Sequence, residues 1–244
     1  MSDAPVLPKD IYNPDYVRDI FNRMSGFYER VNYVTSFGFS IRWRRQFVQA
    51  LAPGTEKLRV IDLMTGMGES WKNIYKHYPN CELTALDFAE NMLLCANQRN
   101  ARHFAGDVRV INQDILQNTL PSNHYDRVFC CYGLKTFNDT QVEIVIREIH
   151  RILKPGGHFS CVEVSVPNCK LLRALYGFYL GRVIPVFGWL LLGNPYEYRM
   201  LWKYTTRFRN ATSVQETFGK AGLRAEYKSY FFGCATGLYG TKTS

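Results

Sequence analysis

Short apolar runs alternate with helical segments between residues 57 and 165, and this alternation limits the fold more than any other feature of the chain. Turn residues flank the runs, and the longest segment between them repeats its apolar residues at three- and four-residue spacing. Strands that alternate with helices form a parallel sheet covered on both faces. The predicted strands are residues 57–64, 81–87, 107–114, 125–133 and 158–165, and the predicted helices are residues 69–78, 89–100 and 139–154.

The end of the chain adds two strands of a different kind. Residues 221–244 contain two strand-like stretches that turn near Gly233, which is typical of an antiparallel hairpin at a sheet edge. The sequence therefore predicts a doubly wound α/β fold with a mainly parallel seven-stranded sheet.

Two further segments stand outside this pattern. Residues 10–51 predict an amphipathic helical cap. Residues 168–212 are rich in apolar and aromatic residues, but Arg173, Arg182 and several Gly and Pro interrupt the stretch 171–192, which favours a lid or an interfacial helix over a membrane span. At 244 residues we expect a single domain, 1–244, with the cap at 10–51, a cofactor-binding core at 57–165, the aromatic lid at 168–212 and a C-terminal helix and hairpin at 213–244.

The charge of the chain suggests an acidic partner. A net charge of +9 suits nucleic acid, an anionic membrane surface or a phosphate-bearing substrate, although a merely solvated surface explains it as well. No nucleic-acid-binding motif accompanies it, so we predict no nucleic acid partner and favour peripheral contact with a membrane. Seven cysteines without metal-ligand spacing predict reduced thiols and no metal site, and the N-terminus resembles no signal peptide, so we expect a cytoplasmic protein, peripheral at the inner membrane surface.

Three carboxylates and a glycine loop follow successive predicted strands. Asp62 precedes the loop of Gly66 and Gly68, Asp87 ends the second strand, and Asp114 ends the third. In an open parallel sheet, ligands bind at the carboxyl ends of the strands where the strand order reverses. Each signal alone also fits a simpler role, namely a tight turn, a helix N-cap or a turn residue, and the loop lacks the third glycine of a dinucleotide-binding motif. Together they predict a cofactor site.

The same stretches resemble a known family. "RVIDLMTGMGES", "LTALDFAENML", "VINQDIL", "YDRVFCCYGLKTFND" and "EIHRILKPGGHFSCVEVS" are similar to the successive motifs of class I S-adenosylmethionine-dependent methyltransferases. The cap "IFNRMSGFYERVNYVTSFGFSIRWRRQFV" and the tail "YKSYFFGCATGLYGTK" resemble those of the UbiE family, the C-methyltransferases of ubiquinone and menaquinone biosynthesis. The resemblance covers about residues 17–242 and implies a Rossmann-like methyltransferase fold.

The resemblance also implies how S-adenosylmethionine binds. Gly66, Met67 and Gly68 would line its methionine part, where the family usually has Thr in place of Met67. The resemblance places the remaining cofactor residues as follows: Asp62 beside the glycine loop, Asp87 at the ribose, Asp114 and Ile115 at the adenine, and Cys131 beside the sulfonium, with Phe88 as a further cofactor-binding residue.

The expected acceptor site departs from the family. Lys135 and Thr136 replace the usual Arg-Asn pair, whereas Tyr28 matches the active-site tyrosine of the cap. Lysine keeps the positive charge but loses the planar fork of arginine. We expect these three residues to be catalytic and the acceptor to be a hydrophobic, quinone- or quinol-type aromatic. The enzyme is expected to act as a monomer or a homodimer. Two alternatives stay open: an amino-transferring relative of the rhodoquinone-forming enzymes, and a non-catalytic module that binds a lipid or a partner.

Overall fold

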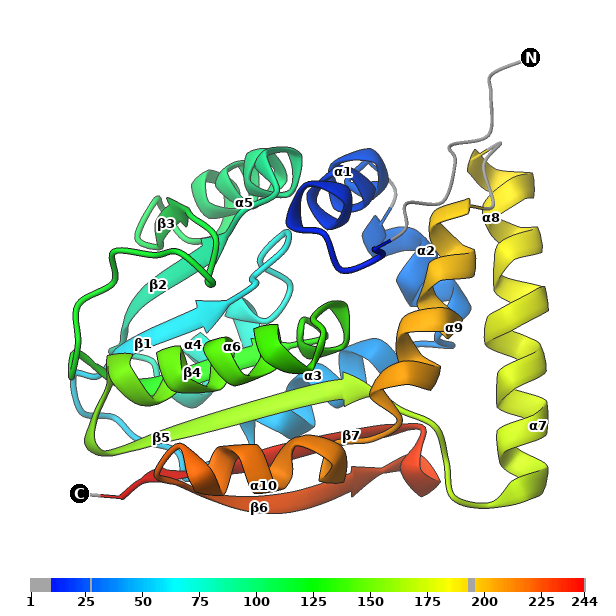
Figure 1. Cartoon of the computed structure of the whole chain (residues 1–244). Coiled ribbons are helices and arrows are strands. Elements are labelled where there is room, and N and C mark those ends of the chain that lie inside the picture. Colours follow the sequence, from blue (N-terminus) through cyan, green and yellow to red (C-terminus); the bar gives the residue numbers. More distant parts are fainter. Residues whose placement is uncertain (1–9, 27, 193–195, 244) are drawn as a thin grey trace.

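A seven-stranded sheet forms the centre of the protein, as predicted. The computed structural model describes residues 10–26, 28–192 and 196–243. The strands run in the spatial order β3-β2-β1-β4-β5-β7-β6, and β7 pairs antiparallel with both β5 and β6, whereas the other neighbours are parallel (Figure 1). Their bounds are β1 Arg59–Leu63, β2 Glu82–Asp87, β3 Arg109–Asn112, β4 Tyr125–Cys131, β5 Leu153–Val164, β6 Leu223–Tyr230 and β7 Ala235–Lys242.

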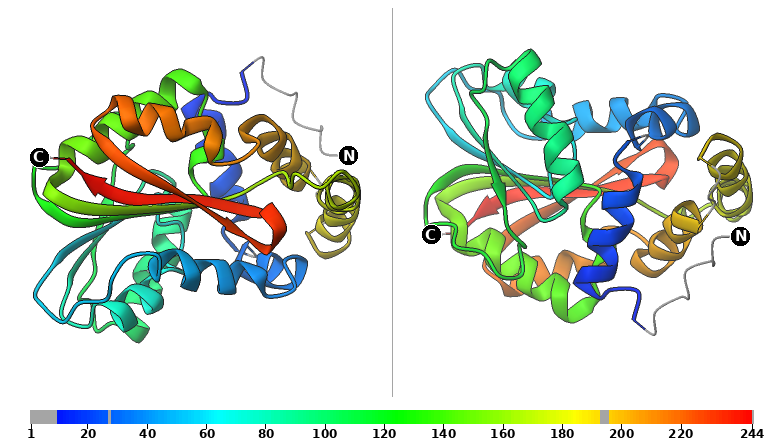
Figure 2. Two further views of the ribbon diagram at one scale, coloured as in Figure 1. Left: turned by 90° about the horizontal axis from the view of Figure 1, so that it is seen from below. Right: turned by 90° about the horizontal axis from the view of Figure 1, so that it is seen from above.

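Helices cover both faces of the sheet (Figure 2). One face packs against α6 (Asp139–Ile152) and α10 (Thr212–Lys220), where Ile146, Phe159 and Phe218 are fully buried. The other packs against α3 (Phe39–Val48), α4 (Trp71–His77) and α5 (Glu90–His103) around Phe47 and Phe129. Burial on both faces explains why the strands are apolar runs rather than alternating ones.

The junction between α6 and β5 differs from the prediction. We expected the helix to run to residue 154 and the strand to begin at residue 158, but α6 ends at Ile152 and β5 begins at Leu153. Leu153 pairs with Tyr125, and the next pair is His158 with Arg127, so the pairing is interrupted at the Pro-Gly-Gly turn. The chain resumes the same strand after this irregularity, because Gly156 adopts a φ of 71° there.

The cap consists of α1 (Pro14–Met24), α2 (Tyr28–Thr35) and α3, and the insertion of α7 (Lys170–Phe178), the π-helical turn η2 (Tyr179–Val183), α8 (Ile184–Leu192) and α9 (Tyr196–Phe208). Helices α1 and α2 and the insertion lie beyond the carboxyl ends of the parallel strands, whereas α3 packs on the sheet (Figure 1). The π turn ends two residues before Pro185, where a missing backbone N–H disturbs the regular hydrogen-bond ladder. Within the described residues, no helix has both the length and the apolarity needed to cross a bilayer.

Two short 3₁₀ turns complete the edge that faces the cap. The turn η1 (Leu134–Thr136) follows β4, and η3 (Phe231–Gly233) joins β6 to β7 as the hairpin turn expected near Gly233. Both turns contribute side chains to the cavities described next.

Candidate functional site

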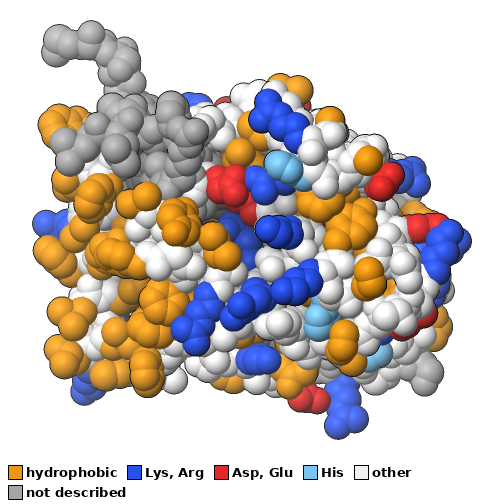
Figure 3. Space-filling view, turned by 180° about the vertical axis from the view of Figure 1, so that it is seen from behind, with side chains coloured by type: hydrophobic (Ala, Val, Ile, Leu, Met, Phe, Trp, Pro, Cys, Tyr) orange, Lys and Arg blue, Asp and Glu red, His pale blue; other side chains and the backbone are white. Residues whose placement is uncertain are grey.

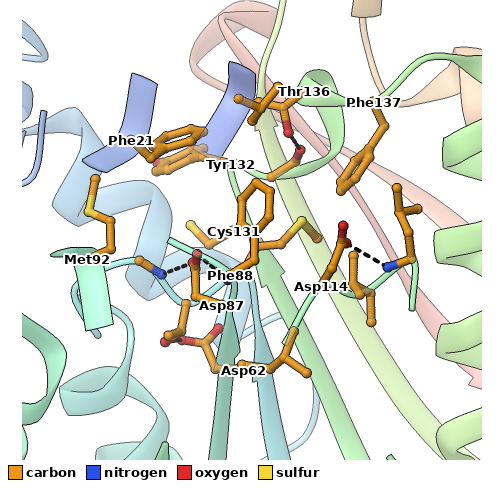
Figure 4. A pocket seen from close by; sticks show the side chains of 18 of the residues that line it. Phe21, Asp62, Asp87, Phe88, Met92, Asp114, Cys131, Tyr132, Thr136 and Phe137 are labelled. Atoms are coloured by element: carbon orange, nitrogen blue, oxygen red, sulfur yellow. Dashed lines mark hydrogen bonds between the residues drawn. The ribbon is translucent and has the colours of Figure 1, made fainter. Parts of the chain in front are cut away.

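A cavity lies at the carboxyl ends of β1 to β4, where the strand order reverses between β1 and β4. It holds about 870 Å³ of space, part of it open to solvent. Helix α1 borders this cavity. At one end of α1, Asn22 forms hydrogen bonds with Glu90 and Asn91 of α5. Near the other end, Gln141 of α6 donates to the carbonyl of Tyr12. Figure 4 shows Asp62, Asp87 and Asp114 at the tips of neighbouring strands. We call this space the cofactor cavity.

The two glycines of the loop after β1 have different tasks. Gly66 lines the cofactor cavity, adopts a φ of 58° and donates its N–H to Asp87 Oδ2 at 2.7 Å. Gly68 does not line it; its φ is 77°, and an added Cβ would lie 2.7 Å from the ring of Trp71. Gly68 therefore serves the turn and its packing, whereas Gly66 opens the backbone to a ligand. Met67, expected at the cofactor, does not line the cavity, but its N–H donates to Glu69 Oε2 at 3.2 Å.

Asp87 organises the backbone around the cavity. Besides Gly66, the N–H groups of Phe88 and Ala89 donate to its Oδ1 at 2.8 and 3.0 Å. Burial raises the pKa of this carboxyl, and the three N–H donors oppose that rise. The side chain thus fixes the glycine loop to the start of α5, and it lines the cavity as expected.

Asp62 carries an oxygen without a partner. Its Oδ2 accepts a hydrogen bond from Thr65 Oγ1 at 2.6 Å, while Oδ1 is buried and has no hydrogen-bond partner. Burial raises the pKa of Asp62 from 3.8 to about 7. A buried polar atom without a partner is costly. Because Asp62 lines the cavity, a cationic ligand group there would supply the hydrogen-bond donor that Oδ1 lacks.

An ion pair from the cap stands at the same end of the cavity. Arg44 of α3 bonds Glu69 through Nη2 and Oε1 at 3.0 Å, and each side chain is 7% exposed. Both residues line the cavity, so a guanidinium and two carboxylates, Glu69 and Asp62, gather around the glycine loop. This set can receive a zwitterionic amino acid group.

Part of the lining of the cofactor cavity is apolar. Phe88, Met92, Ile115 and Leu116 contribute to it, which suits a flat aromatic base. Asp114 lies at its edge, where its Oδ1 accepts the N–H of Leu116 at 2.8 Å.

Cys131 and Thr136 line the cavity where β4 leads into η1. Burial raises the pKa of the Cys131 thiol strongly, so the thiol is neutral. The hydroxyl of Thr136 donates to the carbonyl of Gly133 at 2.7 Å and thereby stabilises the η1 turn.

A second cavity, the acceptor cavity, lies between the cap and the insertion. It holds about 1200 Å³ and is lined mainly by apolar and aromatic side chains from α2, α3, α7, η2 and η3. Among the described residues, only Tyr132 lines both cavities. Its ring is 9% exposed, its φ is 65°, and its hydroxyl lies 3.3 Å from the carbonyl of Ser40 in the cap. Tyr132 therefore stands where the two cavities meet.

Lys135 brings the positive charge to the acceptor cavity. It lines that cavity and not the first, and among the described lining residues it alone is charged. Its Nζ donates to Glu163 Oε1 at 2.8 Å and to the carbonyl of Tyr132 at 2.7 Å. Glu163, at 1% exposure, also accepts the backbone N–H groups of Lys135 and Val164, at 3.1 and 2.8 Å. These hydrogen bonds hold the Lys135–Glu163 ion pair in place, and they leave the third N–H of the ammonium for a ligand.

Tyr28 is the one predicted catalytic residue that cannot be placed, because its side chain lies outside the described part of the chain. Tyr132 follows the fourth predicted strand, at one of the strand ends where the sequence predicts ligand contacts. Three residues that the sequence did not single out belong to the two cavities or support them. Arg44, Glu69 and Glu163 lie on different elements that only the folded chain brings together. Of these, Glu163 had a signal, because it lies near the carboxyl end of the fifth strand.

Comparison with known proteins identifies the family. The profile of the ubiE/COQ5 methyltransferase family matches residues 9–242. A demethylmenaquinone methyltransferase of Geobacillus kaustophilus is 33% identical over 93% of this chain and 96% of its own, and one of Listeria monocytogenes is 29% identical over 93% and 95%.

Among solved structures, an S-adenosylmethionine-dependent methyltransferase from Thermotoga maritima has the same fold, with a TM-score of 0.65 at 20% identity over 92% of this chain and 99% of that one. A Haemonchus contortus phosphoethanolamine N-methyltransferase, in complex with S-adenosylhomocysteine, matches with a TM-score of 0.62 at 15% identity, over 89% of this chain and 59% of that one. The matches give the amino-transfer alternative no support and contradict a non-catalytic module. The chain belongs to the ubiE/COQ5 methyltransferase family, and it is an S-adenosylmethionine-dependent methyltransferase.

Proposed function

We propose that the enzyme methylates a ring carbon of a quinol that carries an apolar tail; its curated relatives are named demethylmenaquinone methyltransferases. One observation carries the proposal: an apolar cavity with one ammonium group adjoins the cofactor cavity across Tyr132. An aromatic ring and a tail fit apolar walls, and an ammonium suits an oxygen that becomes negative.

The residues of the cofactor cavity fit S-adenosylmethionine. Asp62, Glu69 and Arg44 would hold its amino acid end, because Asp62 Oδ1 is buried without a partner and the guanidinium stands beside it. Asp87 would receive the ribose, and Phe88 and Ile115 would enclose the adenine. When bound, the cofactor supplies an electrophilic methyl group on a sulfonium.

Lys135 would activate the acceptor. A quinol that gives its hydroxyl proton to solvent as it binds has a more nucleophilic ring carbon, and an ammonium at that oxygen stabilises the resulting phenolate. After the methyl transfer, the proton on the methylated carbon is lost to solvent and the ring is aromatic again. The third N–H of Lys135 Nζ is the group for this task, since the other two bond Glu163 and the Tyr132 carbonyl. Glu163 keeps the ammonium in place, and the apolar walls exclude water and strengthen the interaction with the oxygen. A hydrogen bond from Tyr28 to the acceptor stays a prediction.

The direct test is product analysis. Purified enzyme, S-adenosylmethionine and a reduced demethylnaphthoquinone with a short prenyl tail should yield S-adenosylhomocysteine and a product heavier by one CH₂. Lys135→Met should bind S-adenosylhomocysteine normally and lose most of the transfer. If neither the naphthoquinol nor a benzoquinol is methylated while the protein binds S-adenosylhomocysteine, the acceptor class is wrong.

The cytoplasmic location and the homodimer stay predictions. Fractionation of cells and sedimentation velocity of the purified enzyme test them separately from the chemistry.

A further inference from the structure

The mouth of the acceptor cavity is bordered by exposed apolar side chains. Phe37, Leu175 and Phe231 line the cavity, yet they are 76%, 60% and 47% exposed. A side chain that meets both the cavity and the solvent stands at the opening. Three elements far apart in the sequence therefore form the entrance: the loop before α3, helix α7 and the turn η3.

Further exposed apolar side chains extend this border outward. Leu171, Phe178 and Phe232 are 71%, 64% and 80% exposed. Ring contacts connect the elements: Phe37 stacks on Tyr179 at 5.7 Å between centroids, and Phe39 meets Phe231 at 4.3 Å. Figure 3 shows apolar side chains gathered on the α7–α8 side of the molecule. We call the set Phe37, Leu171, Leu175, Phe178, Phe231 and Phe232 the apolar rim.

The three sequence segments that carry the apolar rim are basic. Segments 33–47, 170–189 and 227–234 contain seven Lys and Arg and no Asp or Glu. Arg42, Arg45, Lys170, Arg173 and Arg182 are exposed. In Figure 3 a row of Lys and Arg lies beside the apolar side chains. An apolar surface bordered by cations complements a bilayer that carries anionic headgroups, because each cation near such a surface adds about 1 kcal/mol of attraction.

We propose that the apolar rim rests on an anionic lipid bilayer, with the mouth of the acceptor cavity opening into the acyl layer. Within the described residues no helix can cross the bilayer, so the contact is interfacial. The proposal adds a partner to the proposed function and depends on it only for which molecule enters. A lipid-tailed acceptor could then move from the bilayer into the cavity without crossing water.

Vesicle sedimentation tests the contact without any acceptor. Vesicles of phosphatidylcholine with phosphatidylglycerol, free of quinone, should retain the enzyme, and salt should weaken the binding. Vesicles of phosphatidylcholine alone should retain less. Because the test contains no quinone, an error in the proposed acceptor does not affect it.

Two matched pairs of variants separate the apolar and the charged parts. Phe178→Ser with Phe232→Ser should lower the partition coefficient about tenfold or more, since burying one Phe side chain is worth at least that factor. Leu94→Ser, on an exposed residue of α5, should leave it unchanged. Arg42→Glu with Arg182→Glu should remove the preference for anionic vesicles, whereas Lys72→Glu with Arg102→Glu, on α4 and α5, should keep most of it.

Binding of S-adenosylhomocysteine checks that each variant is folded. The proposal is overturned if the wild type ignores anionic vesicles, or if the variants of the apolar rim bind as well as the wild type. It is also overturned if sedimentation velocity shows a dimer that Phe178→Ser with Phe232→Ser converts to a monomer while neither form binds vesicles, because a second copy would then cover the rim.

Discussion

Replacing Lys135 with Met should destabilise the protein by about 3 kcal/mol, because the change leaves a buried carboxylate without its cation. Glu163 is 1% exposed, and the lost ammonium supplies one of the three hydrogen bonds that its carboxylate accepts from Lys135 and Val164. The two backbone N–H donors stay in place, so the cost falls at the low end of the range for breaking a buried pair. Glu163→Gln should cost about as much, since it leaves the ammonium without a counter-charge.

The double variant Lys135→Met, Glu163→Gln should recover much of this loss. A neutral pair of similar volume needs no charge compensation, so urea unfolding of the four proteins should give a coupling energy of about 2 kcal/mol or more. Methyl transfer should stay low in the double variant despite its recovered stability, because the ammonium that faces the acceptor is absent. A coupling energy below about 0.5 kcal/mol would refute the buried ion pair, and a double variant with normal kcat would refute the role of Lys135.

Three further predictions concern the cofactor cavity. The pKa of Asp62 is about 7 in the folded protein and 3.8 ordinarily, so the unfolded chain loses this proton first and stability should fall between about pH 4 and about pH 7, by roughly 4 kcal/mol at most. Asp62→Asn should remove that slope in urea unfolding, and an unchanged slope would contradict the raised pKa. Gly68→Ala should cost about 2 kcal/mol or more in unfolding free energy, whereas Gly106→Ala, also at positive φ but with no atom within 4 Å of the new Cβ, should cost only about 1 kcal/mol. Equal costs would show that the Trp71 ring moves aside. Arg44→Met should weaken S-adenosylhomocysteine binding about tenfold in calorimetry because it removes a charge-assisted partner, whereas Arg45→Met, an exposed neighbour, should not; equal affinities would exclude Arg44 from the site.

Local patterns predicted the sheet and one side of the site. A buried parallel strand is a short apolar run, so its position can be read without knowing its neighbours, and the rule that strand ends meet at one edge placed Asp62, Asp87 and Asp114 together. The predicted junction of α6 with β5 was wrong because tertiary contact decides the pairing of Leu153 with Tyr125.

The second cavity was beyond the reach of local patterns. The family resemblance, and not a local pattern, assigned Lys135 to the acceptor site, and its ion pair depends on Glu163, which the parallel pairing of β4 with β5 brings alongside. Arg44 reaches Glu69 only when the cap folds onto the glycine loop. Glu163 could have been found by extending the strand-end rule to the fifth strand.

The conformation of Tyr132 offers a way to redesign the enzyme. A φ of 65° is one that glycine adopts without strain, so removing this side chain would relieve the backbone rather than burden it. Tyr132→Gly would widen the junction between two cavities that the chain builds from different parts: the strand-end loops on one side, and the cap with the 168–212 insertion on the other. One substitution would thus enlarge the space for the acceptor ring, at the loss of the contact that the Tyr132 ring makes with the Arg44 guanidinium.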